Sequence, residues 1–164
     1  MHKSFLQSKR GVWVLNLKKL YQQVLLDHNK NPRNFKVIEN ATHYAHGVNP
    51  LCGDDYHLFI KIEEDIIKEI GFHGTGCAIS KSVSSMMTTH LINKKTEDAI
   101  KIKDSFIELL TEKLTNEDAK HLLGHLTLFE NVKDFPVRVK CATLIWRALE
   151  AALLNKVDKK ISTE

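Results

Sequence analysis

The sequence predicts an α+β fold, in which a small antiparallel sheet of about three strands packs against several helices. Patterns with strand periodicity come early in the chain and helical patterns follow them, which favours α+β over an alternating arrangement. The clearest strand has apolar residues at every second position, namely Tyr56, Leu58, Ile60 and Ile62. With 164 residues, 43% of them hydrophobic, the chain suits one such domain.

The beginning of the chain is expected to hold an extension, a helix and a first strand. We interpret residues 1–16 as a mobile N-terminal extension, because their apolar run is shorter than the ~7–15 residues of a signal-peptide core. Apolar residues at helical spacing then predict a helix from Leu17 to His28, which the segment Asn31–Asn34 ends with its proline. A first strand is expected over His43–Val48.

The remaining elements follow from a polar turn and a change of period. Residues 63–65 are acidic and form the turn of a hairpin, whose returning strand is Ile66–Phe72. After Gly76 the spacing becomes helical. Four helices are expected: one over Ile79–Leu91, one capped by Thr96 and extending to Leu114, a short one capped by Asn116 and ending after Leu123, and a last one from Pro136 to about Lys156. The single domain therefore spans 17–156, and 157–164 form a C-terminal tail.

Composition argues against several classes of partner. The formal net charge is +4, and the lysines are scattered without an interleaved aromatic stripe, which disfavours nucleic-acid binding. No stretch of ~20 apolar residues is present, so no transmembrane helix or membrane partner is expected. Three cysteines far apart in sequence are typical of a reducing compartment, where such residues are buried, catalytic or metal-binding. We expect a cytoplasmic protein.

Two loop segments each offer a cysteine. In Asn49–Asp55, Cys52 and Asp54 flank a glycine, which allows a thiolate and a carboxylate, both zinc ligands, to turn toward one point. An ordinary polar turn explains this segment equally well. In Gly74–Ser80, Cys77 stands at a helix N-terminus, where free N–H groups and the helix dipole lower a thiol pKa. The alternative for Cys77 is a buried structural cysteine, and the segment lacks the spacing of a phosphate-binding loop.

The third cysteine lies near the start of the last helix. Cys141 is on the apolar face, so a core cysteine is the default interpretation. Arg138 and Lys140 precede it, and cationic neighbours would stabilise a thiolate and offset a negative site, although solvated surface charge explains them too.

Together the three segments supply three thiolates and one carboxylate. Four such ligands suit a tetrahedral zinc or one corner of an iron–sulfur cluster. A cysteine hydrolase is disfavoured, because no histidine is singled out by spacing as a base. Four histidines are alternative ligands for which surface or capping roles are favoured: His73, His90, His121 and His125.

The same segments resemble the NifU/IscU-like family of iron–sulfur cluster assembly proteins, and most closely its SufU branch. The resemblance rests on Asn49–Asp54, on Gly76–Ser80 with Ser84–Thr88, on Phe135–Leu144, and on the opening helix with Asp27–Asn34, and it covers roughly 17–156. It implies an α+β fold with a small antiparallel sheet. It also implies that Cys52, Asp54, Cys77 and Cys141 bind the metal, and that a cysteine desulfurase delivers persulfide sulfur.

Two features favour the SufU branch over scaffold-type IscU proteins. Lys140 occupies the position before the last cysteine, where IscU proteins have histidine. The segment from about Lys94 to Asn131 also fits the insertion that SufU-like chains carry between the second and third cysteines. Members of that branch are similar to zinc-dependent sulfurtransferases.

The resemblance leads to three hypotheses of function. In the first, the chain is a SUF-type, zinc-dependent sulfurtransferase. Cys52, held by zinc until a SufS-type desulfurase displaces it, accepts persulfide sulfur for downstream cluster-assembly proteins. The chain would then act with the desulfurase rather than as a free-standing enzyme. In the second, the same residues hold iron as a [2Fe–2S] cluster that is assembled and transferred. In the third, the chain is an adaptor with structural zinc.

Overall fold

The computed structural model describes residues 2–111, 117–154 and 161–162. The elements in chain order are α1 (His2–Lys30), β1 (His43–Asn49), β2 (Asp54–Glu63), β3 (Ile66–Thr75), α2 (Ala78–Leu91), α3 (Thr96–Thr111), α4 (Glu117–Leu123), the 3-10 segment η1 (Gly124–Asp134), α5 (Pro136–Leu153) and β4 (Ile161–Ser162). Three antiparallel strands followed by helices confirm the α+β prediction. No described helix is both long and apolar enough to cross a bilayer.

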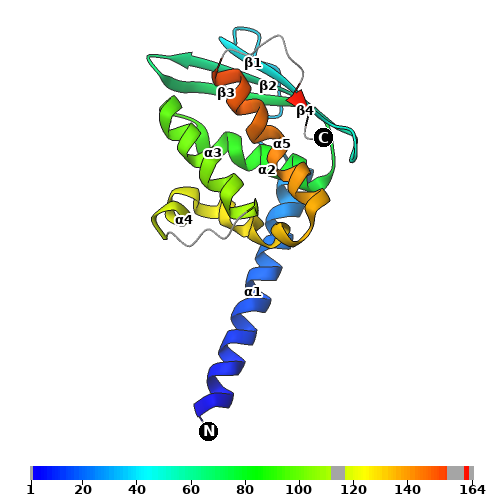
Figure 1. Cartoon of the computed structure of the whole chain (residues 1–164), viewed down its shortest axis with the longest axis vertical. Helices are drawn as coiled ribbons and strands as arrows, with labels where there is room; N and C mark the ends of the chain where they lie inside the picture. Colours follow the sequence, from blue (N-terminus) through cyan, green and yellow to red (C-terminus); the bar gives the residue numbers. More distant parts are fainter. Residues whose placement is uncertain (1, 112–116, 155–160, 163–164) are drawn as a thin grey trace.

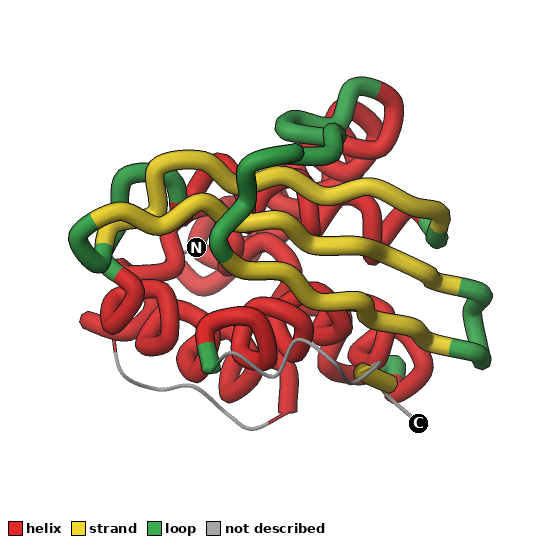
Figure 2. Tube along the Cα trace, turned by 90° about the horizontal axis from the view of Figure 1, so that it is seen from above, coloured by secondary structure: helices red, strands yellow, loops and turns green. Residues whose placement is uncertain are grey.

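The sheet has the order β3-β2-β1-β4, with β1, β2 and β3 antiparallel. Along β2, buried residues alternate with half-buried ones, because successive side chains point to opposite faces. The helices lie against one face of the sheet, as Figure 2 shows. The short strand β4 was not predicted. It pairs in parallel with Gly47 and Val48 of β1, and two residues carry no periodic signal of their own.

Helix α1 is longer than the sequence pattern indicated, beginning at His2 rather than Leu17. Residues 2–16, expected as an extension, continue this helix, and its first part projects from the rest of the molecule (Figure 1). Their mobility stays a prediction. The helix ends at Lys30, two residues before Pro32, since proline excludes the residue before it from helical conformation.

The other helices follow the prediction with shifted ends. Pro136 is the first residue of α5, as expected, but α5 ends at Leu153 rather than near Lys156. The predicted cap Asn116 lies outside the described residues. The segment after Gly124 forms η1, which the sequence pattern did not indicate.

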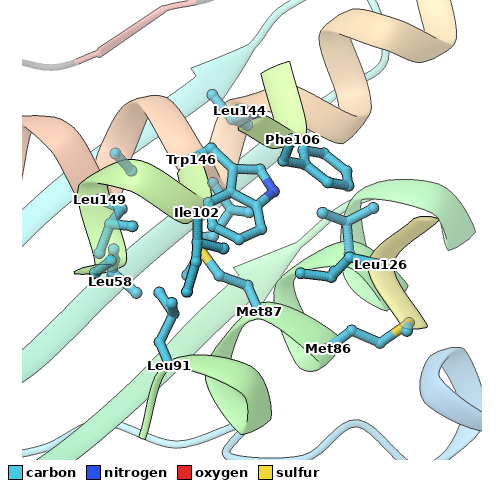
Figure 3. Close-up of a cluster of buried hydrophobic side chains, with 14 of the residues drawn as sticks. Leu58, Met86, Met87, Leu91, Ile102, Phe106, Leu126, Leu144, Trp146 and Leu149 are labelled. Carbon is cyan, nitrogen blue, oxygen red and sulfur yellow. The ribbon is translucent and has the colours of Figure 1, made fainter. Parts of the chain in front are cut away.

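The hydrophobic core lies between the sheet and the helices. Trp146 of α5 is fully buried, and its ring stacks on Phe106 of α3 with centroids 5.0 Å apart. Leu58 of β2 and Met87 of α2 join the same cluster, which Figure 3 shows. Because α2 and α5 pack against the sheet through this core, the first turns of both helices lie near the β1–β2 turn.

Candidate metal centre

The three cysteine-bearing segments meet at one end of the sheet. They are the β1–β2 turn, the residues just before α2 and the second turn of α5. The ligand atoms of Cys52, Asp54 and Cys141 all lie within 4.8 Å of one another. The Cys141 and Cys52 Sγ atoms are 2.9 Å apart, so residues 89 positions apart in sequence face each other directly.

A tight turn presents Cys52. Asn49 ends β1 and pairs with Asp54, which begins β2, so four residues close the connection. The Cys52 backbone N–H donates to the Asn49 carbonyl oxygen at 3.2 Å. Gly53 has φ +70°, a conformation that favours glycine. Cys52 and Cys77 are half-buried, whereas Cys141 is buried.

Asp54 is only 2% exposed, and three donors hold its carboxylate. Its Oδ1 accepts from the Cys77 backbone N–H at 2.9 Å and from the Ser80 hydroxyl at 3.0 Å. Its Oδ2 accepts from Asn49 Nδ2 at 3.4 Å. A buried carboxylate is costly unless such bonds satisfy it, and these bonds also aim the side chain at the two sulfurs.

Cys77 lies beside this trio rather than within it. It is the N-cap of α2, and its Sγ accepts from the Ser80 backbone N–H at 3.4 Å. Its thiol nevertheless approaches Cys141 closely enough to raise the pKa of that residue. Gly76 makes this entry into α2 feasible, because an added methyl group would overlap the hydroxyls of Tyr56 and Ser80.

The donor set fits a divalent cation. Burial raises the pKa of the Cys141 thiol far above its usual range, and the thiols of Cys52 and Cys77 and the Asp54 carboxylate raise it further. Cys52 accepts a hydrogen bond from the protonated Cys141 thiol, and the charges of Cys77 and Asp54 oppose another negative charge beside them. A cation that binds thiolates and carboxylates would remove this conflict, and zinc prefers such sulfur and oxygen donors in a closed set of four. Cys52, Asp54, Cys77 and Cys141 are the residues that would hold it.

The two predicted supporting cations do not pair with the candidate ligands. Arg138 is exposed, and its guanidinium lies over the Phe135 ring, 4.5 Å from the centroid. Burial raises the pKa of Tyr21, the charge of Arg138 lowers it, and Cys77 raises it. Lys140 is half-buried. Among the described residues, neither cation forms an ion pair.

Three neighbours of the site were not assigned a role from the sequence. Asn49 is fully buried, and its Nδ2 contacts Cys141 Sγ at 3.5 Å as well as Asp54. Ser80 bridges Asp54 to the hydroxyl of Tyr56, whose pKa burial raises well above its usual range. Asn49 and Ser80 belong to the two cysteine-bearing loop segments, and this position was the signal that could have identified them. For Tyr56, the sequence showed only the alternation typical of a strand.

The histidines considered as alternative ligands lie elsewhere. His73 stacks on Phe35 with ring centroids 4.8 Å apart, on the face of the sheet away from the helices. His90 contacts the Leu122 carbonyl oxygen at 2.9 Å. His121 belongs to α4 and His125 to η1, and the described thiol and carboxylate cluster includes neither.

Comparison with known proteins identifies the family of this chain. Residues 20–155 match the NifU-like N-terminal domain family. The zinc-dependent sulfurtransferase SufU of Bacillus subtilis is 40% identical over 141 residues, covering 86% of this chain and 94% of that protein. The iron–sulfur cluster assembly scaffold protein IscU of Streptococcus pyogenes is 36% identical over 148 residues, covering 90% of this chain and 91% of that protein.

Solved structures with a similar fold include one from the same group of proteins. A protein assigned as an iron–sulfur cluster assembly scaffold of the SUF system, from Fervidobacterium islandicum, superposes with a TM-score of 0.74 at 33% identity, covering 79% of this chain and 93% of that one. A crystal structure of a hypothetical protein superposes with a TM-score of 0.76 at 38% identity, covering 83% and 98%. The chain therefore belongs to the NifU-like N-terminal domain family, close to the IscU and SufU proteins.

Proposed function

We propose that this chain serves iron–sulfur cluster assembly as a zinc-dependent sulfurtransferase that accepts persulfide sulfur on Cys52. The observation that carries the proposal is the position of Cys52. Its thiol belongs to the cluster with Asp54 and Cys141, yet it is half-buried on a turn of four residues, whereas Cys141 is buried in α5. The similarity to SufU of Bacillus subtilis, a protein named as a zinc-dependent sulfurtransferase, supports the same role.

Of the four candidate ligands, Cys52 is the one expected to leave the metal, and the other three are expected to retain it. Cys52 is carried by the turn next to Gly53, whose φ is positive and whose surroundings are open. Cys141 lies within α5, Cys77 is the N-cap of α2, and Asp54 is fixed by its three donors. Zinc, when bound, would keep the thiols deprotonated at neutral pH. The donor sulfur would therefore be accepted by Cys52, a half-buried residue on the turn.

The transfer step is an exchange between sulfur atoms. The Cys52 thiolate attacks the outer sulfur of a persulfide on a SufS-type cysteine desulfurase. A new S–S bond forms on Cys52, the S–S bond of the donor breaks, and the donor leaves as a thiolate. Arg138, exposed near the start of α5, would attract an acidic partner surface.

The test follows sulfur onto individual cysteines. The purified chain is incubated with cysteine and a SufS-type desulfurase, and its peptides are weighed after the unreacted thiols are blocked. We expect one added sulfur atom on the peptide with Cys52, and none on the peptide with Cys141. Cys52→Ala should accept no sulfur and should no longer stimulate the desulfurase. If Cys52→Ala still does both, the assignment of Cys52 is wrong.

A [2Fe–2S] scaffold is the second candidate function. It is favoured by Asp54, an oxygen donor among sulfurs that would release iron more readily than a fourth thiolate, and by the similarity to the IscU scaffold of Streptococcus pyogenes. Anaerobic reconstitution with iron and sulfide separates the two candidates. A sulfurtransferase should form no stable cluster and should keep about one zinc per chain. Stable cluster absorption with matching iron and sulfide would instead establish the scaffold.

A further inference from the structure

A row of histidines crosses the outer face of the sheet, away from the cysteine cluster. His46 of β1 pairs with His57 of β2, which pairs in turn with His73 of β3. Asp55 precedes His57 by two residues on the same strand, so both side chains point to the same face. The helices pack against the opposite face, as Figure 2 shows, so an ion can approach this group from solvent.

Three of these side chains converge on one point. The Nε2 atom of His46 lies 2.6 Å from Asp55 Oδ1, and the Nε2 atom of His57 lies 3.9 Å from the same oxygen. The two imidazole rings are stacked, with centroids 4.2 Å apart and planes 10° apart. All three ligand atoms fall within 4.8 Å of one another. Two imidazole nitrogens and one carboxylate oxygen thus share a space of the size that a metal ion takes.

A tyrosine orients one of the imidazoles. The hydroxyl oxygen of Tyr44 lies 2.6 Å from His57 Nδ1, and the two rings are stacked with centroids 5.9 Å apart. When Nδ1–H donates to this hydroxyl, the lone pair of Nε2 remains free and faces Asp55. A metal-binding histidine is commonly held in this way, by a hydrogen bond from its other ring nitrogen.

The exposure of the cluster suits exchange of an ion with solvent. The side chains of His46, His57 and Asp55 are 25%, 39% and 48% exposed. Their backbones are nevertheless held by two adjacent strands of the sheet, so the three groups are arranged before any ligand binds. Three protein ligands on an exposed face leave at least one coordination position for water.

We propose that His46, Asp55 and His57 form a second metal site, which binds a divalent ion of the zinc, nickel or copper class. Imidazole is the ligand these ions prefer, and one carboxylate completes a common three-ligand set. The site is separate from the cysteine cluster, because Asp54 and Asp55 are successive strand residues and point to opposite faces of the sheet. It also does not depend on the proposed sulfur transfer.

The experiment is a zinc titration of the full chain, purified without a metal-affinity tag and followed by the nitrogen NMR signals of the imidazoles. We expect the signals of His46 and His57 to shift together. The shift should saturate when one zinc per chain has bound to these residues. His43 is the internal control, since it lies on β1 and its ring contacts Thr42 instead. If His46 and His57 shift no more than His43, the proposal is wrong.

Matched variants test the same site by metal content. His46→Gln and His57→Gln should each bind one zinc fewer than the unmodified chain under saturating zinc, while His43→Gln should bind the same number. Tyr44→Phe should keep the site but weaken it by roughly 10-fold or more, as loss of a histidine's hydrogen-bond partner does. Circular dichroism checks that each variant is folded. Equal zinc content in His46→Gln and the unmodified chain would overturn the proposal.

Discussion

Asp54 and Asp55 are neighbours in the chain, yet their carboxylates have opposite surroundings. Asp54 is buried and accepts three hydrogen bonds beside the thiols, whereas Asp55 is half-exposed beside His46. The strand geometry of β2 separates them, because successive side chains point to opposite faces. At the scale of single residues, the chemistry of this end of the sheet is therefore set by strand position as much as by residue type.

Thiol reactivity gives a prediction at this scale. In the folded chain treated with a zinc chelator, Cys141 should be alkylated by iodoacetamide more slowly than Cys52, by roughly tenfold or more. The reason is that Cys141 is buried and its pKa is raised, whereas Cys52 lies on the turn. Peptide mass spectrometry over time measures the order. In urea, where burial is lost, the two rates should become similar, and a persisting difference would contradict this explanation.

The strand β2 is the element that connects the core to the site. Its inward residues Tyr56, Leu58 and Ile60 are buried against the helices, and its first residue is Asp54. The same strand carries Asp55 and His57 on its outer face. A change on the inner face should therefore act through packing, and a change on the outer face should leave the stability of the fold nearly unaltered.

The two faces of β2 can be compared directly. Ile60→Ala should lower the free energy of unfolding by about 2–5 kcal/mol, because it leaves a cavity in a fully buried position. Lys61→Ala is the matched control, since Lys61 lies on the outer face and its half-exposed side chain forms an ion pair with Glu63 at 3.5 Å. It should change the free energy of unfolding by no more than about 0.5 kcal/mol. Urea denaturation measures both, and equal effects would contradict the layer assignment.

At the scale of the whole molecule, two histidines lie where helices meet. His28 of α1 contacts the Ser85 hydroxyl of α2 through Nδ1 at 2.7 Å. His90, near the end of α2, contacts the carbonyl oxygen of Leu122 in α4 at 2.9 Å. Burial lowers the pKa of both histidines. The charge of Arg33 lowers the pKa of His28 further, and the charge of Lys94 does the same for His90. The packing of α1, α2 and α4 thus includes two imidazoles that resist protonation.

Stability should therefore fall as the pH is lowered. A histidine with a depressed pKa in the folded state takes up its proton more readily when unfolded, so stability is full above the ordinary value of 6.5 and is lost as the pH falls below it. Urea denaturation between about pH 7.5 and about pH 5.5 measures this slope. His90→Gln should reduce the slope, whereas His43→Gln, a change on β1 away from the helix contacts, serves as the reference. An unchanged slope in His90→Gln would show that His90 does not contribute.

Local patterns in the sequence were enough to predict the element types and the segments that hold the cysteines. Alternation in β2, helical spacing after Gly76 and Pro136 at the start of α5 are local signals, and local signals report periodicity within one element. The order of the three cysteine motifs likewise sufficed to identify the family, because it depends only on residue types and their separation along the chain.

Which side chains contact one another depends on the packing of the folded chain. The contact of Cys52 with Cys141 and the three donors around Asp54 join residues from different elements. The same holds for β4, which pairs with β1, and for the convergence of His46 and His57, which depends on the register between two strands. Register and packing arise from contacts far apart in sequence, and no single segment contains that information.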